Sequence, residues 1–149
     1  MNPKVSILLP HFQTPRLTLL CLRLLRLKTA NVNYETIVID NGSTDGSGEL
    51  LRKIRWINLV RRENHPGERP ARSHGLALNL GVEHARAPLI LTMHTDTMVL
   101  RPDWLEFLVD TIERGGPECG IVGSWKMEAE KPLRRVGKWI EETLRRWRG

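Results

Sequence analysis

Cysteine is scarce in this chain: Cys21 and Cys119 are the only two among 149 residues. Each stands in an apolar context, and neither has the paired spacing of a redox motif or a zinc site. The two thiols therefore predict buried, reduced side chains in a reducing compartment, and not a fold held together by disulfides.

Long apolar runs are missing as well. No stretch approaches the ~18 to 20 apolar residues that crossing a bilayer requires. The apolar run at residues 5–9 follows Met1 almost directly and is too short for a secretory leader. Together with the reduced thiols, these features predict a cytoplasmic protein.

Aromatic residues make up only 5% of the sequence, and it contains no nucleic-acid-binding motif, internal repeat or low-complexity tract. The net charge of +6 favours anionic partners such as nucleotide phosphates, nucleic acid or anionic lipid. Nucleic acid is the least supported of these, because aromatic residues are not interleaved with the basic ones. The hydrophobic share of 40% suffices for the core of one domain, which we expect over residues 1–149.

Short apolar runs alternate with stretches of helical periodicity along the chain. Strands are expected at residues 4–10, 34–40, 56–60, 89–94 and 120–125, and helices at residues 15–28, 48–55, 71–84, 102–114 and 133–148. This alternation predicts an α/β fold with a mostly parallel central sheet and helices on both of its faces.

Polar residues follow three of the first four expected strands. In parallel sheets, ligands bind beyond the carboxyl ends of the strands, so these residues are expected to share one rim. They are Pro10, His11 and Phe12 after the first strand, Asp40 and Asn41 after the second, and His94, Thr95 and Asp96 after the fourth.

Two of these carboxylates have more than one interpretation. Asp40 either accepts hydrogen bonds from the amides of the following turn or binds a base edge or a ribose hydroxyl. Asp96 either forms the turn into the next helix or holds Mg²⁺ or Mn²⁺, which take carboxylate and phosphate oxygens. His94 is a second metal ligand better suited to Mn²⁺, a phosphate donor, or simply a strand-end residue. Asp45, near the start of the second helix, favours a capping role.

Three stretches resemble family 2 glycosyltransferases in their order and spacing: VSILLPHFQT, YETIVIDNGSTDGSGELL and ALNLGVEHARAPLILTMHTDTMVLRPDWL. They fall within residues 4–108. The resemblance implies the GT-A fold, a Rossmann-like three-layer sandwich. It also implies a hexosyltransferase-type enzyme that takes a sugar from a nucleotide donor, usually UDP-linked. The sugar would pass with inversion to a saccharide or lipid-linked acceptor.

The resemblance also implies roles for individual residues. Asp96 matches the last aspartate of the family's DxD motif, which holds Mg²⁺ or Mn²⁺ on the diphosphate, and His94 stands in place of the first. The nucleotide would be bound by Pro10, His11 and Phe12 against the base, by Asp40 pairing with the base, by Asn41 and Thr95 nearby, and by Arg72 facing the phosphates.

The chain departs from the family in its length. Family members continue into an acceptor-side region that carries an Asp or Glu general base, so the resemblance is to a short or truncated form. Glu128 and Glu130 are the nearest candidates for that base, and the catalytic residue is left unassigned. The alternative is a non-catalytic nucleotide-sugar-binding or assembly module. A nucleotidyltransferase is less favoured, because residues 10–17 lack a glycine-rich basic phosphate loop.

The last expected helix, at residues 133–148, is amphipathic and basic. Its apolar positions recur at steps of three or four residues, and arginines and lysines surround them. This pattern is typical of a helix at an inner membrane surface, and equally of a dimer contact or of ordinary packing on the sheet.

Overall fold

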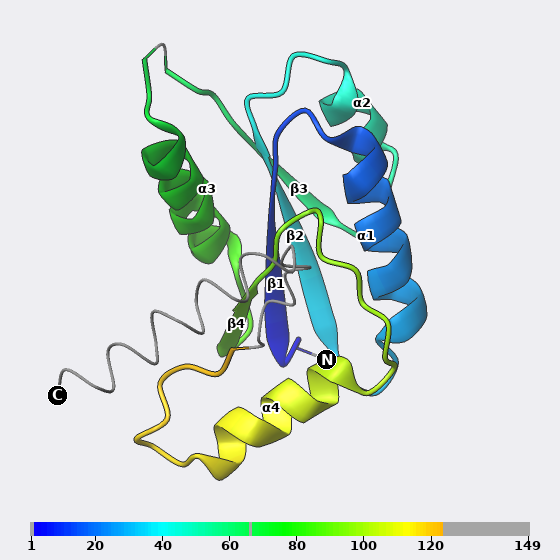
Figure 1. Cartoon of the computed structure of the whole chain (residues 1–149), viewed down its shortest axis with the longest axis vertical. Coiled ribbons are helices and arrows are strands. Elements are labelled where there is room, and N and C mark those ends of the chain that lie inside the picture. The colour runs from blue at the N-terminus through cyan, green and yellow to red at the C-terminus, as the bar shows by residue number, and fades with distance from the viewer. Residues whose placement is uncertain (1, 66, 124–149) are drawn as a thin grey trace, which may run out of the picture.

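The computed structural model describes residues 2–65 and 67–123 (Figure 1). Its centre is a parallel sheet in the spatial order β3-β2-β1-β4. In this sheet Val5 pairs with Tyr34 on one side and with Leu89 on the other. The strands are β1 (Val5–His11), β2 (Tyr34–Asn41), β3 (Asn58–Arg62) and β4 (Leu89–Thr92).

Helices cover both faces of this sheet. They are α1 (Pro15–Lys28), α2 (Ser47–Arg52), α3 (Pro70–His84) and α4 (Trp104–Arg114). Helices α1 and α2 lie on one face and α3 on the other, while α4 crosses near the amino ends of the strands (Figure 1). The GT-A-like three-layer arrangement expected from the sequence is therefore confirmed.

The alternation of side chains along each strand divides the core into two clusters. Ile7 and Leu9 of β1 pack with Leu22 and Leu25 of α1, whereas Leu8 of β1 points to the other face. On that face Leu8 forms a second cluster with Ile37 and Ile39 of β2 and Ala77 of α3. The near-continuous apolar strands follow from this, because a parallel sheet with helices on both faces buries both sides.

Most element bounds lie within two residues of those expected. Strand β4 ends at Thr92, and α4 begins at Trp104. Strand β3 lies two residues later than expected, because the chain is still turning at Trp56 and Ile57.

The fifth strand is not found in the part of it that the structure describes. Residues 120–123 have no regular secondary structure, and Ile121 is 90% exposed. A strand needs a neighbour or a buried face, and this segment has neither among the described residues. Residues 124–125, Glu128, Glu130 and the expected helix at 133–148 lie outside the described ranges. Within those ranges, none of the helices combines the length and the hydrophobicity that crossing a bilayer requires.

Candidate functional site

Three loops meet at the carboxyl edge of the sheet. The hydroxyl of Thr14, after β1, lies 3.3 Å from that of Thr95, after β4. The backbone N–H of Gln13 donates to Ser43 Oγ at 3.1 Å, which joins the β1 loop to the β2 loop. Because β1 is the central strand of these three, its loop connects the other two into one rim.

His11 lies beneath this rim and is buried. Its Nδ1 is 2.8 Å from Thr18 Oγ1 and its Nε2 is 2.8 Å from Ser47 Oγ, so both ring nitrogens have partners. Burial lowers the pKa of His11, and the charges of Asp40 and Asp45 only partly offset this. A neutral imidazole therefore joins the end of β1 to α1 and α2.

Asp40 is also buried, at the end of β2. Its Oδ1 accepts the backbone N–H of Ser43 at 3.0 Å, the turn-stabilising role considered from the sequence. Its Oδ2 has no hydrogen-bond partner among the described residues. Gly48 gives this oxygen room, because a Cβ there would lie 2.7 Å from it.

Asp45 does not cap α2 as expected, because the N-cap residue is Gly46 and its left-handed backbone separates Asp45 from the helix. Its carboxylate accepts the backbone N–H of Ser47, in the first turn of α2, at 3.1 Å and also the Ser47 hydroxyl. The hydroxyl bond is the main cause that lowers the pKa of Asp45.

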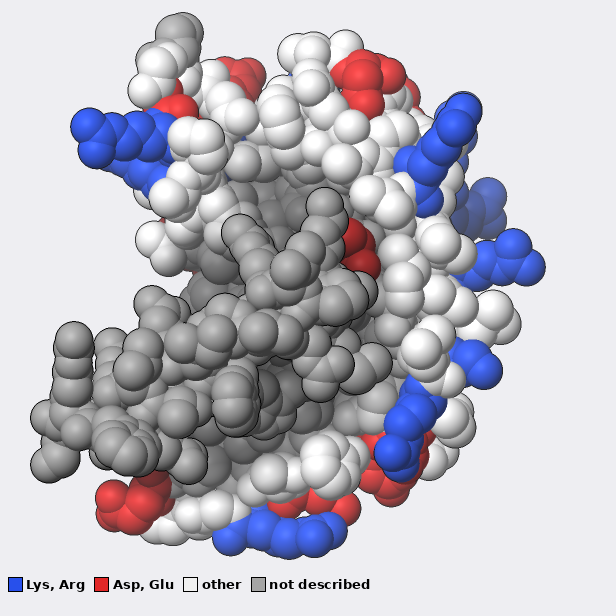
Figure 2. All heavy atoms as spheres, in the orientation of Figure 1, with Lys and Arg blue, Asp and Glu red and all other residues white. Residues whose placement is uncertain are grey.

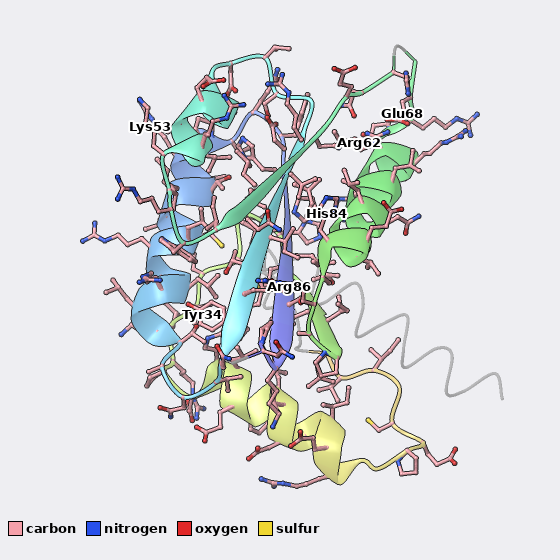
Figure 3. All side chains as sticks on the ribbon, turned by 180° about the vertical axis from the view of Figure 1, so that it is seen from behind. Tyr34, Lys53, Arg62, Glu68, His84 and Arg86 are labelled. Carbon is pink, nitrogen blue, oxygen red and sulfur yellow. The ribbon has the colours of Figure 1, made fainter. Side chains whose placement is uncertain are left out.

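Asn41 belongs to a polar network that the sequence did not reveal. Arg62 Nη1 donates to Asn41 Oδ1 at 2.7 Å, and Arg62 Nη2 donates to both Glu68 oxygens at 2.7 and 2.6 Å. The side chains of Arg62 and Glu68 point toward one another in Figure 3. Asn41 Nδ2 also donates to Ser73 Oγ at 2.9 Å. These bonds hold the start of α3 and the loop before it against the end of β2.

The sequence feature that could have indicated this network is Arg62 itself, a basic residue at the end of β3. The apolar pattern ends the third strand at residue 60 and so predicts a loop at Arg62, whereas β3 extends to this residue. The bonds from Arg62 are the main cause that lowers the pKa of Glu68, so the pair is ionic.

The β1 loop leaves an aromatic side chain on the surface. Phe12 is half-exposed, and Pro10 before it is partly buried. Gln13 has a φ of 49°, in the left-handed region that non-glycine residues seldom adopt, and its Nε2 donates to Thr44 Oγ1 at 2.8 Å. The turn at Gln13 and its hydrogen bond to Thr44 thus fix the β1 loop directly after Phe12.

The β4 loop carries the predicted metal ligands on its surface. His94 and Asp96 are exposed, and the ring of His94 stacks on that of His74 of α3, with centroids 5.1 Å apart and an interplanar angle of 4°. Burial raises the pKa of Cys21 to about 11, and Asp96 adds to the shift, which indicates that this carboxylate lies close to α1.

The described residues hold no cluster of three or more His, Cys, Asp or Glu side chains that would bind a metal ion by themselves. The Asp96 carboxylate forms no ion pair with any described residue. One free carboxylate with a neighbouring imidazole fits a divalent cation whose other ligands come from substrate phosphates and water.

The predicted residues thus divide into two sets. On or near the surface of the rim lie Phe12, His94, Thr95, Asp96 and, in the first turn of α3, Arg72. Beneath it lie His11, Asp40 and Asn41, which hold the loops in place. Pro10 lies between the two sets. The arrangement offers an aromatic side chain, a carboxylate and a cation around one edge of the sheet.

Comparison with known proteins finds a matching family model and related sequences. A family model described as "Glycosyl transferase family 2" matches residues 6–147. "O-antigen biosynthesis protein RfbC" of Myxococcus xanthus is 30% identical over 139 residues, which are 91% of this chain and 10% of that protein. "Glycosyltransferase GlyG" of Streptococcus pneumoniae serotype 4 is 26% identical over 129 residues, 84% of this chain and 40% of that protein. The chain thus spans less than half the length of either relative.

Solved structures share the fold. S. aureus TarS 1-349 in complex with UDP has a TM-score of 0.63 at 18% identity, covering 85% of this chain and 40% of that one. The mannosyltransferase PcManGT from Pyrobaculum calidifontis, in complex with GDP-Man and Mn²⁺, has a TM-score of 0.57 at 25% identity, covering 73% and 32%.

Proposed function

The chain belongs to glycosyltransferase family 2, and from this premise we propose that it binds a nucleotide-sugar, UDP-linked, at the carboxyl edge of its sheet. We further propose that it transfers the sugar, with inversion, to a saccharide or lipid-linked hydroxyl. The observation that carries the proposal is the hydrogen-bonded meeting of the β1, β2 and β4 loops. It leaves Phe12 and Asp96 exposed around one rim.

Each rim group has a proposed part in holding the donor. The exposed ring of Phe12, with Pro10, forms a wall for the nucleobase. Arg72 and Thr95 face the phosphates, where a guanidinium provides charge and directed hydrogen bonds. The assignment of His11, Asp40 and Asn41 to the nucleotide stays a prediction. His11 and Asn41 have their polar atoms engaged, and Asp40 has one oxygen left.

We propose that Mg²⁺ or Mn²⁺ is held by Asp96 with His94 as a second ligand. The imidazole favours Mn²⁺ over Mg²⁺, because nitrogen ligands suit the softer ion. When bound, the ion neutralises the charge that develops on the leaving diphosphate. The Asp96 carboxylate is exposed and has no ion-pair partner among the described residues, whereas His94 would give up its stacking on His74.

The alternative function is a nucleotide-sugar-binding or assembly module without transfer activity. It is the alternative that the sequence leaves open, since no catalytic base is assigned in it. The two functions share the donor site and differ in the acceptor side. A single domain over residues 1–149 and a cytoplasmic location remain proposals for both.

A thermal-unfolding panel tests donor binding. The chain is heated with UDP, GDP, CDP or TDP, each with and without Mn²⁺. We expect selective stabilisation by UDP with Mn²⁺, of about 2.7 kcal/mol at a concentration of roughly 100 times the Kd. Release of UDP from UDP-sugars in the presence of saccharide and lipid acceptors then separates the enzyme from the binding module. Equal melting temperatures in all conditions would refute the donor site itself.

A further inference from the structure

Helix α1 has two apolar sides, of which only one is used by the core. Its buried residues face the sheet, and Leu22 and Leu25 are among them. A second set of leucines recurs at steps of three, four and three along the helix, at positions 17, 20, 24 and 27. Three of them are 44%, 46% and 64% exposed, namely Leu17, Leu20 and Leu27. An exposed apolar stripe of this kind is typical of a contact site for a protein or a membrane.

The same helix carries positive charge only. Its cations are Arg16, Arg23, Arg26 and Lys28, and it contains no Asp or Glu. None of the four forms an ion pair with a described residue. Figure 2 shows Lys and Arg side chains along the edge of the molecule at which α1 lies in Figure 1. The exposed leucines are thus accompanied by uncompensated cations.

Neighbouring segments widen this surface. The segment from Thr95 to Trp104 runs beside α1, because Thr95 bonds Thr14 and Trp104 Nε1 donates to Thr29 Oγ1 at 2.9 Å. Within it Leu100 is 74% exposed. On the other side, Lys53 at the end of α2 points outward along the same edge as α1 (Figure 3). Exposed apolar and basic groups thus also occur on the segments that flank α1.

We propose that this surface binds an anionic membrane. We call it the α1 face and define it by Arg16, Leu17, Leu20, Arg23, Leu27 and Leu100. A helix that binds at a membrane surface inserts apolar side chains such as leucine among the headgroups. Its arginines contact the lipid phosphates. Since the other side of α1 is already packed on the sheet, binding requires no folding of the helix.

A second copy of the chain fits this surface less well. The leucine spacing is that of a two-heptad coiled-coil seam, whereas stable seams run for three or four heptads. Pairing two α1 faces would also bring the arginines of one copy against those of the other. The charge of the α1 face therefore selects an anionic surface.

The position of α1 relates this surface to the candidate nucleotide site. The helix begins at Pro15, directly after the loop that joins the rim. A bilayer bound along the α1 face would therefore lie close to the rim. A hydroxyl on a membrane lipid could then approach the candidate nucleotide site. The inference goes beyond the proposed function and does not depend on nucleotide binding.

Sedimentation of the whole chain with vesicles tests the inference. Vesicles of phosphatidylcholine with about 30% phosphatidylserine are compared with phosphatidylcholine alone, because anionic lipid sets the surface potential. We expect binding to the anionic vesicles only, weakened by salt. The double variant Arg16→Gln/Arg23→Gln should weaken it about 25-fold, since each cation near the surface contributes about fivefold. The double variant Leu20→Ser/Leu27→Ser should abolish it.

A matched control carries Arg69→Gln and Val82→Ser, two exposed positions at and within α3 on the other face of the sheet. It should bind the vesicles like the unchanged chain. Circular dichroism and the UDP melting shift establish that each variant is folded and keeps its donor site. The inference is overturned if the whole chain ignores anionic vesicles or if the α1-face variants bind them equally well. It is also overturned if those leucines support self-association without lipid binding.

Discussion

The imidazole of His11 lies between two hydroxyl oxygens, Thr18 Oγ1 and Ser47 Oγ, each 2.8 Å from a ring nitrogen. Thr18 belongs to α1 and Ser47 to α2, so one side chain joins both helices to the end of β1. Ser47 Oγ also donates to Asp45, which extends the bonds to the β2 loop. The rim thus depends on the protonation state of a buried group.

This dependence gives a pH prediction. Because burial lowers the pKa of His11, the folded chain binds this proton less readily than the unfolded chain. Its neutral state therefore contributes stability that is complete above the unfolded pKa of about 6.5 and is lost as the pH falls below it. We therefore expect the melting temperature to begin to fall as the pH drops below about 6.5. The variant His11→Gln should be less stable at neutral pH and show a flatter profile. The variant His84→Gln, at an exposed ring, is the matched control.

A pair of glycines in α3 tests how closely this helix packs on the sheet. A Cβ at Gly81 would lie 3.0 Å from Ile39 Cδ1 and 3.2 Å from Leu8 Cδ1. Gly81→Ala should therefore lower the free energy of unfolding by about 1–3 kcal/mol through overpacking. At Gly75, in the same helix, a Cβ meets nothing within 4 Å, and Gly75→Ala should stabilise by about 0.5–1 kcal/mol. Urea denaturation measures both, and equal effects would contradict the close contact.

Two arginine–glutamate pairs test the polar network. The side chain of Arg62, paired with Glu68, is 11% exposed, whereas that of Arg86, paired with Glu35, is 73% exposed. Arg62→Met removes the donor to both Glu68 and Asn41 in a site with little water. Arg86→Met leaves Glu35 with bonds from Ser6 Oγ and from the backbone N–H of residue 86.

We expect Arg86→Met to cost about 1 kcal/mol or less. Arg62→Met should cost several times more, since a carboxylate and an amide oxygen lose a buried partner. Denaturant unfolding of the two variants side by side gives the comparison. Similar losses for both would show that the network at the start of α3 is as well solvated as a surface pair.

The sequence predicted the fold because its signals were local. Apolar runs such as residues 5–9, helical periods such as residues 15–28, and turn residues such as those after Asp40 each report on their own segment. It also placed three strand ends on one rim, since the carboxyl edge is common to all parallel strands.

What the sequence could not predict depends on contacts between distant segments. The leucine repeat of α1 predicted its helix correctly, yet Leu17, Leu20 and Leu27 are not its buried side. Periodicity identifies a helix without saying which of two apolar stripes meets the sheet. The network around Arg62 likewise needs the loop before α3 to fold back, and no local pattern encodes that return.

The last prediction concerns Asp96, whose carboxylate is exposed and has no ion-pair partner among the described residues. Removing it should therefore leave the fold intact, unlike a change at the buried Asp40. If Asp96 holds the divalent ion, Asp96→Ala abolishes the Mn²⁺-dependent part of UDP binding in calorimetry. Glu83→Ala, at an exposed carboxylate in α3, should retain it. Unchanged UDP affinity of Asp96→Ala in the presence of Mn²⁺ would remove the ion from this loop, and would leave the base wall at Phe12 to be tested separately.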